Sequence, residues 1–286
     1  MIRSTASRPT LAWAGRGRRR RVLPGFGLSL GFSVFYLGLL VLIPLAGLVW
    51  KASGQGWEEF VDVTTSDRAL AAYRLTLTAS AVAALVNGVF CTMLAWTVVR
   101  YPLPGRRFID ALVDFPLALP TAVAGLTYTS LWVPNGWLGQ YADALGIKVA
   151  YTQLGIMLVL TFVALPFVVR TVQPVIQSLD LDVEEAAATL GAGRFQVLGR
   201  VIIPSLAPAI LTGVALGFAR AVGEYGSVIF IAGNIPDQTE IAPLLVVIRL
   251  EEFDYAGASA IALVLLAISF VTVGAINLLS RMGRHD

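Results

Sequence analysis

The stretch EEAAATLGAGRFQVLGRVIIP, residues 184–204, lies between two long apolar runs in a chain where charged residues are scarce. Of the 286 residues, 57% are hydrophobic and 14% are charged, and the mean hydropathy is +0.76. In soluble domains about a quarter of the residues are charged. The composition therefore excludes a soluble domain, and it makes residues 184–204 a polar insert in an integral membrane protein.

Six apolar stretches are long enough to cross a bilayer, because a helix needs roughly 20 apolar residues to span about 30 Å of hydrocarbon. In lipid the backbone polar groups must be satisfied within the segment, which favours helices, and the alternating pattern of a membrane β-barrel is absent. We expect an all-α, polytopic integral membrane protein with about six transmembrane helices. The expected spans are residues 28–50, 72–98, 111–133, 153–173, 206–232 and 257–280.

The distribution of arginine predicts the orientation of these spans. With six spans, fourteen arginines fall on one side, in the N-terminal tail, the second and fourth connections and the C-terminal tail. The opposite connections hold only Lys51, Arg68, Lys148 and Arg249, among several acidic residues. Since basic residues accumulate on the cytoplasmic side, both termini are expected in the cytoplasm, and the protein in the cytoplasmic (inner) membrane.

On this interpretation the chain has three parts. Residues 1–27 form a basic cytoplasmic tail, residues 28–280 a single transmembrane domain with a cytoplasmic loop at 174–205, and residues 281–286 a second tail. The basic run GRGRRRR at 15–21 adjoins the first span, so it is interpreted as an orientation signal and no nucleic-acid partner is expected. The first apolar run has no small-residue cleavage site after it, which indicates an uncleaved helix.

Several kinds of chemistry are excluded by residue counts. The single cysteine, Cys91, lies in an apolar run, and the single histidine, His285, is the penultimate residue. No disulfide framework, metal site or histidine-based catalysis is therefore expected. A phosphate-binding loop needs Gly-Lys-Ser/Thr, but Lys51 follows a tryptophan and Lys148 follows an isoleucine. The chain should have no catalytic residue, no ATPase site and no bound cofactor.

The polar insert has the pattern of a short helix. Asp182 and Glu185 have the spacing of a capping box, and Gly191 and Gly193 supply a stop and a turn. A small apolar face follows from the helical spacing of Val183, Ala186, Ala187 and Leu190. Such a helix suits either a groove in another protein or the bilayer surface, and periodicity does not separate the two.

Residues 185–204, EAAATLGAGRFQVLGRVIIP, resemble the EAA loop of the ABC-importer permeases. That pattern is EAA, three residues, glycine, then some nine residues before an aliphatic-x-aliphatic-proline end, which Val201 and Ile203 complete with a mild departure in residue type. The resemblance implies the fold of a type I importer permease. It also implies that residues 182–198 form coupling helices that dock in a cleft of a separate ATPase subunit, which uses ATP and Mg. The implied coupling residues are Glu185, Ala186, Ala187, Leu190, Gly191, Phe195 and Pro204.

The fifth span contains two charged residues, Arg220 and Glu224, within GFARAVGEYGSVIFIAGNIP, residues 217–236. They lie four apart and can pair on one helix face. Each charge alone would cost about 2.5–3.5 kcal/mol at the centre of a membrane helix. Two interpretations stay open, a structural ion pair and a lining of the translocation pathway. Gly213 and Gly217 form a GxxxG pattern, which permits close helix approach.

Two further segments resemble one branch of the same family, the T-type permease subunits of sulfate/thiosulfate importers. They are LALPTAVAGLTY, residues 117–128, and the segment 239–270, which contains LEEFDYAGASA. The resemblance implies a second, different (W-type) permease subunit, two ATPase subunits and an extracytoplasmic sulfate/thiosulfate-binding protein, in the lipid bilayer. Because RAVGEYG and AGNIP are similar in molybdate permeases, a molybdate/tungstate or other oxyanion importer stays an alternative.

For a dianion, hydroxyl and amide donors are suitable partners. Candidate pathway hydroxyls in the third span are Thr121, Thr127 and Ser130, with Tyr128 and Thr129 beside them. Hydroxyls in membrane helices also bond to their own backbone, which is the alternative. A secondary transporter is less favoured because inverted repeats are not visible. An intramembrane enzyme would need clustered acids at bilayer depth, which the pattern does not offer.

Overall fold

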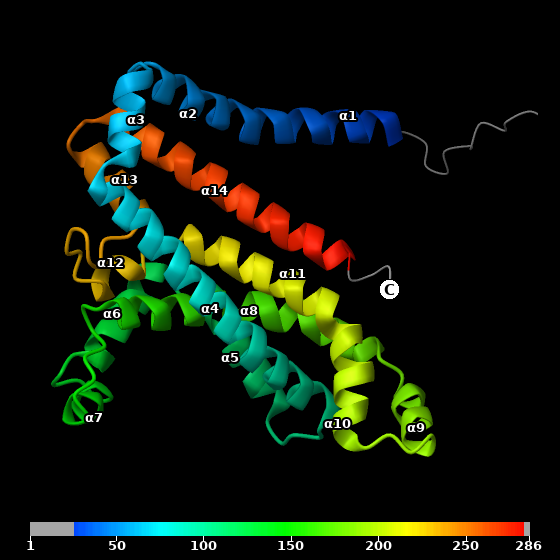
Figure 1. The fold of residues 1–286 in the computed structure, drawn as a ribbon. Coiled ribbons are helices and arrows are strands. Elements are labelled where there is room, and N and C mark those ends of the chain that lie inside the picture. Colours follow the sequence, from blue (N-terminus) through cyan, green and yellow to red (C-terminus); the bar gives the residue numbers. More distant parts are fainter. Residues whose placement is uncertain (1–25, 283–286) are drawn as a thin grey trace, which may run out of the picture. The chain divides into compact units, whose positions relative to one another are not determined.

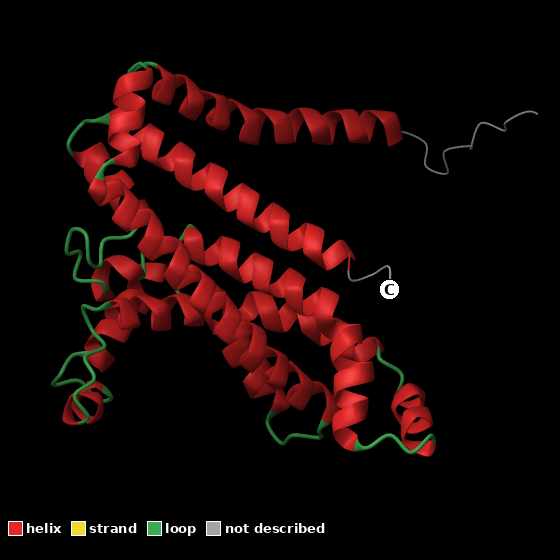
Figure 2. Ribbon diagram, in the orientation of Figure 1, coloured by secondary structure: helices red, strands yellow, loops and turns green. Residues whose placement is uncertain are grey.

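A computed structural model describes residues 26–282, with side chains to residue 278 (Figure 1). All regular structure in this range is helical (Figure 2). The basic run at 15–21 and His285 lie outside the described residues. The chain divides into two units, one ending at Gly47 and the other beginning at Leu48.

The first unit is an apolar helix that runs on into the second. It consists of α1 (Phe26–Leu37), the π-helical turn η1 (Gly38–Leu42) and the start of α2 (Ile43–Ser53). With the rest of α2 they form the stretch Phe26–Ser53, 28 residues that are apolar enough to span a membrane and that contain the expected span 28–50. Within the first unit no side chain of α1 or η1 is buried.

Three long helices form the core of the second unit, α4 (Asp67–Arg100), α8 (Gln153–Ser178) and α11 (Ile203–Val222), which lie side by side (Figure 1). The buried face of α4 is built from small residues such as Ala72, Ala79 and Ala83. Small side chains let membrane helices approach closely, where dispersion contacts replace the hydrophobic effect that lipid does not provide. The last helix, α14 (Tyr255–Met282), packs against α11.

The glycine pattern in α11 is used in this packing. A Cβ atom on Gly213 would lie 3.0 Å from Cα of Val168 in α8, and one on Gly217 would lie 3.6 Å from Ala164. The close helix approach that the GxxxG pattern predicts is therefore confirmed, and the partner is α8.

The third expected span, 111–133, is wrong as one straight helix. Two helices, α5 (Arg106–Ala118) and α6 (Thr121–Trp132), meet at a bend of 110°. Pro120 cannot donate a backbone hydrogen bond, and it pushes Leu119 into an extended conformation (φ −82°, ψ 129°). Within the described residues, five helical stretches are long and apolar enough to cross a membrane, or six when this bent pair is counted as one span.

The fifth expected span, 206–232, has different limits in the structure. One helical stretch runs from α10 (Arg194–Val197) through the π-helical η2 (Leu198–Ile202) into α11, and it ends at Val222. The helix is interrupted at residues 223–227, and the short α12 (Val228–Ile231) follows. The expected end at 232 is wrong, because the helix ends at Val222. Apolar residues continue beyond Val222, so hydropathy does not reveal the break that the Glu224 side chain stabilises.

The shorter helices lie at the two ends of the second unit. At one end are α3 (Trp57–Thr65), α6, α7 (Gly139–Ala144), α12 and α13 (Ala242–Glu251), and at the other is α9 (Leu181–Thr189) beside α10 (Figure 1). Glu240, before α13, is tied to the start of α4 by two 2.7 Å hydrogen bonds from Arg68. The Ala242 backbone N–H donates to Thr76 Oγ1 at 2.8 Å. These contacts attach the segment after α12 to the core.

Candidate functional site

The polar insert folds into a helical hairpin, α9 followed by α10 (residues 181–197, the α9–α10 hairpin). Helix α9 begins at Leu181 after the N-cap residue Asp180, which makes no side-chain capping bond. The predicted capping box of Asp182 and Glu185 is therefore wrong, because the helix begins before Asp182. Asp182 and Glu184 instead lie in the first turn, where acidic side chains interact favourably with the helix dipole.

Gly191 ends α9, as its position predicts. Its φ of +86° lies in the left-handed region, which glycine adopts without steric cost. The Gly191 N–H donates to the carbonyl of Ala188, and the Ala192 N–H donates to that of Ala187. These two bonds are the Schellman pattern, which satisfies carbonyls at the end of a helix. Gly193 is the N-cap of α10, and its N–H donates to Gln196 Oε1 at 2.9 Å.

The predicted coupling residues lie together on this hairpin, and most are accessible. Leu190 is 88% exposed and Phe195 is 89% exposed; Glu185 and Ala186 are exposed, and Ala187 is half-buried. Pro204 stands apart from them, as the second residue of α11. Two large apolar side chains are thus almost fully exposed on a polar hairpin.

One side-chain cluster joins α9 to the end of α4, and sequence reasoning missed it. Arg100, the last residue of α4, donates from Nη2 to Glu184 Oε1 at 2.8 Å and to the Leu179 carbonyl at 3.2 Å. Its guanidinium lies 5.1 Å from the Trp96 ring. The sequence identified Arg100 only as an orientation charge, because its partner lies 84 residues away along the chain.

Arg220 and Glu224 pair, as their spacing predicts. Arg220 Nη1 donates to Glu224 Oε2. The other oxygen, Oε1, accepts from the Ser227 N–H at 3.0 Å and from Ser227 Oγ at 2.7 Å. Both oxygens of the 2% exposed Glu224 are thus engaged in holding the break before α12, whereas the Arg220 side chain is 32% exposed.

The break in the fifth span lies against the start of α6. A Cβ on Gly226 would meet Thr121 Oγ1, and a Cβ on Gly125 would meet the Ser227 carbonyl, both far inside van der Waals distance. The structure therefore brings Thr121, one of the predicted pathway hydroxyls, to the segment that Glu224 organises. Glycine on each side makes the close approach of the two broken spans possible.

The other two predicted hydroxyls lie further along α6. Ser130 Oγ donates to the Thr127 carbonyl at 2.9 Å, so it bonds to its own helix, and Thr129 does the same with Gly125 at 2.8 Å. Thr127 is exposed. Tyr128 packs on Phe162, with ring centroids 5.1 Å apart. The structure does not group these residues with Thr121.

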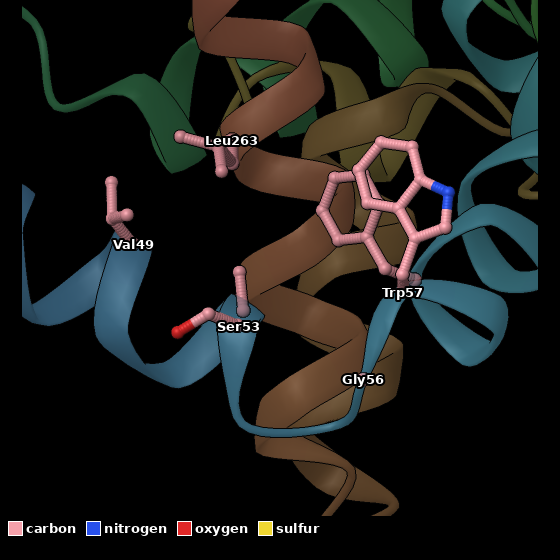
Figure 3. A pocket seen from close by; sticks show the side chains of 7 residues that line it. Val49, Ser53, Gly56, Trp57 and Leu263 are labelled. Atoms are coloured by element: carbon pink, nitrogen blue, oxygen red, sulfur yellow. The ribbon is translucent and has the colours of Figure 1, made fainter.

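Two cavities lie away from Arg220, Glu224 and Thr121. One, of about 360 Å³, lies between the end of α2, the start of α3 and α14, and Trp57 and Leu263 line it (Figure 3). A larger groove of about 660 Å³ between α4 and the η2–α11 helix is lined by apolar side chains such as Val89, Met93 and Ile210. Neither cavity has a charged lining residue, so neither suits an anion.

Comparison with known proteins agrees with this architecture. Residues 85–284 match the model of the family described as "Binding-protein-dependent transport system inner membrane component". The sulfate transport system permease protein CysT of Salmonella typhimurium is 53% identical over 267 residues, covering 93% of this chain and 96% of that protein. The protein of the same name from Synechocystis sp. is 48% identical over 253 residues, with 88% of each chain covered.

Solved structures show the same fold at low identity. A chain from a bacterial ABC transporter involved in the import of the acidic polysaccharide alginate superimposes with a TM-score of 0.73 at 18% sequence identity. The match covers 90% of this chain and 94% of that one. A second structure of a bacterial alginate ABC transporter, in complex with an alginate pentasaccharide-bound periplasmic protein, matches with a TM-score of 0.72.

Proposed function

Because the chain belongs to the family of binding-protein-dependent transport system inner membrane components, we propose that it is a permease subunit of an ATP-driven importer of sulfate and thiosulfate. The observation that carries this proposal is the 53% identity to a sulfate transport system permease over nearly the whole of both chains. In this role the chain forms part of a pathway and needs no catalytic residue, metal or cofactor of its own.

The proposed partners follow from the same assignment. They are a second, different permease subunit, two ATPase subunits that use ATP and Mg, and an extracytoplasmic sulfate/thiosulfate-binding protein. The protein lies in the cytoplasmic membrane, with both termini and the α9–α10 hairpin on the cytoplasmic side. The excess of arginine in the connections on that side supports this orientation.

The α9–α10 hairpin is the proposed contact with the ATPase. The exposed side chains of Leu190 and Phe195 suit a cleft in that subunit, and the small side chains of Ala186 and Ala187 allow close approach. Closure of the two ATPases on ATP moves the hairpin, and the permease pair opens outward to accept the anion. Hydrolysis resets the cycle.

Arg220 is the proposed pathway residue of the pair in the fifth span. Glu224 has both oxygens engaged in the break, so it holds the guanidinium in place. The accessible third of the Arg220 side chain offers N–H donors to a passing dianion. Thr121, which contacts the same break, is the hydroxyl best placed to assist.

Uptake of radiolabelled sulfate in cells that lack this chain tests the proposal. We expect uptake to be lost, to return with the intact chain, and to be competed by thiosulfate more strongly than by molybdate. Stronger competition by molybdate would instead assign the chain to a molybdate/tungstate importer. Uptake that persists after ATP depletion would identify a secondary transporter.

A further inference from the structure

Helix α9 has almost no packing of its own onto the membrane helices. None of its residues is buried, and the apolar side chains of Leu181 and Val183 on its first turn are 56% and 49% exposed. In a soluble or membrane helix, burial of apolar side chains normally fixes the position of the helix. The position of α9 therefore depends on other contacts.

Arg100 makes the hydrogen bonds and the ion pair that, within the described residues, join α4 to α9 and to the corner before it. Arg100 bonds to Glu184 in the first turn of α9 and to the carbonyl of Leu179, the residue that ends α8. The Arg100 and Glu184 side chains are 14% and 24% exposed. Shielding from water strengthens the attraction between the two charges, and loss of one partner leaves the other charge uncompensated.

The other end of this link is the core of the molecule. Arg100 is the last residue of α4, which packs along both α8 and α11. The Trp96 ring, one turn earlier, lies 5.1 Å from the guanidinium and restricts it further. A cation at a helix C-terminus is also stabilised by the helix dipole. The guanidinium thus has a fixed place at the end of the longest core helix.

We propose that Arg100 is a positioning residue that holds α9 to the end of α4 through Glu184 and Leu179, and so transmits movement of the α9–α10 hairpin to the core helices. This inference rests on the proposed coupling function of the hairpin. Arg100 does not contact the ATPase or the anion in this account. It determines how much of the ATPase movement reaches α4.

The test uses the complete transporter, reconstituted in liposomes with its binding protein, and measures sulfate imported and ATP hydrolysed in the same sample. For Arg100→Gln and for Glu184→Gln we expect an assembled complex in which sulfate imported per ATP falls at least tenfold, because the remaining partner of the shielded pair is left without its counterpart. The charge exchange Arg100→Glu with Glu184→Arg should raise the ratio above that of either single variant without restoring it fully, because a carboxylate at position 100 cannot donate to the Leu179 carbonyl and is disfavoured at a helix C-terminus. Arg107→Gln, which removes an exposed charge from the same connection, is the matched control and should leave the ratio unchanged.

A second measurement follows the link directly. In a Cys91→Ser background, spin labels on Thr97→Cys in α4 and Ala188→Cys in α9 report the distance between the two helices. We expect one narrow distance distribution in the otherwise unmodified complex and a broad one with Arg100→Gln. If Arg100→Gln or Glu184→Gln keeps the wild-type transport ratio, or if the distribution stays narrow, the inference is wrong.

These outcomes are distinguishable from failure of the proposed function. If the unmodified complex imports no sulfate on ATP hydrolysis, the assignment of cargo or energy source fails. The label distances then still decide whether Arg100 holds α9 to α4, and a distribution that Arg100→Gln does not broaden would reject that link on its own.

Discussion

Single residues determine where two of the helices, α9 and α11, end. At Gly191 the backbone takes a left-handed conformation (φ +86°) and the carbonyls of Ala187 and Ala188 are satisfied by the turn that follows. At Gly223 the helix ends because the next residue, Glu224, turns its carboxylate to the N–H and hydroxyl of Ser227. The first ending shapes the exposed hairpin, and the second shapes the buried break.

Replacing Gly191 should disturb the hairpin without disturbing the membrane helices. A side chain in the left-handed region costs about 1–2 kcal/mol, and a β-branched one costs more because it is rarely found there. We expect Gly191→Val to reduce sulfate uptake severely and Gly191→Asn to keep most of it, since asparagine tolerates this conformation. Gly193→Ala is the control, because Gly193 has a φ of −70° and the nearest atom to its added Cβ would be 3.9 Å away. Equal uptake for Gly191→Val and Gly193→Ala would contradict this account.

The structural role of the Arg220–Glu224 pair can be distinguished from a role in transport by measuring stability and uptake in the same variants. Glu224→Gln leaves the partly exposed Arg220 without its counter-charge and should lower the free energy of unfolding by about 1–3 kcal/mol. Removing both charges, in Arg220→Gln with Glu224→Gln, should recover most of that stability, which thermal unfolding of the detergent-solubilised complex measures. Transport should stay below about a tenth of wild type in the double variant if Arg220 acts on the anion, because a charge-assisted donor is lost. Recovery of both properties would make the pair purely structural.

At the level of helices, close packing is organised by small residues. Gly213 of α11 lies against the backbone of Val168, and Gly88 of α4 lies against the side chain of Val214, so the three core helices approach each other where side chains are smallest. Larger side chains at these positions would have to displace a neighbouring helix.

Gly213→Leu should destabilise the α8–α11 contact. Added methylenes in a packed interior cost typically about 1–3 kcal/mol, and here a Cβ alone would come within 3.0 Å of a backbone atom. Thermal unfolding of the purified protein should show a lower midpoint than wild type. Gly274→Leu in α14 is the control, since a Cβ at Gly274 meets nothing within 4 Å. If both variants unfold at the same temperature, the contact is not tight.

The apolar runs of the sequence predict the long helices because each of α4, α8 and α14 is one uninterrupted run. They do not predict the breaks at Leu119 and at residues 223–227, since the run of apolar residues continues across both. Pro120 is a visible signal of the first break, whereas the second depends on a carboxylate reaching back to Ser227, which hydropathy does not report. The hairpin is recognisable from its glycine and alanine pattern. The Arg100–Glu184 pair is not, because residues 84 positions apart meet only once the core has formed.

At the scale of the whole second unit, residues 48–282, a core of long helices separates the two proposed functional regions. The α9–α10 hairpin lies at one end, and α3, α6, α7, α12 and α13 lie at the other (Figure 1). Movement of the hairpin can reach the broken spans because α4, α8 and α11 run between the two ends. Coupling through these helices therefore requires that the two ends lie on opposite sides of the membrane.

Cysteine labelling from each side of the membrane tests that arrangement. In a Cys91→Ser background, Leu190→Cys and Leu145→Cys give thiols at side-chain positions that are 88% and 76% exposed. A membrane-impermeant thiol reagent added outside intact spheroplasts should label Leu145→Cys and not Leu190→Cys, and inverted vesicles should give the reverse. Labelling of both positions from the same side would exclude the orientation that the arginine distribution predicts.

The central claim, that the α9–α10 hairpin is where an ATPase subunit engages this permease, is tested most directly by photo-crosslinking from Phe195, which is 89% exposed. A photoreactive amino acid at this position in the complete transporter should give a cross-linked product with the ATPase subunit, in a yield that changes when ATP is added. The same group at Phe270 in α14, an exposed apolar position in a transmembrane helix, should give none. Cross-links from Phe195 only to lipid or to this chain, with no ATPase product under any nucleotide condition, would contradict the claim.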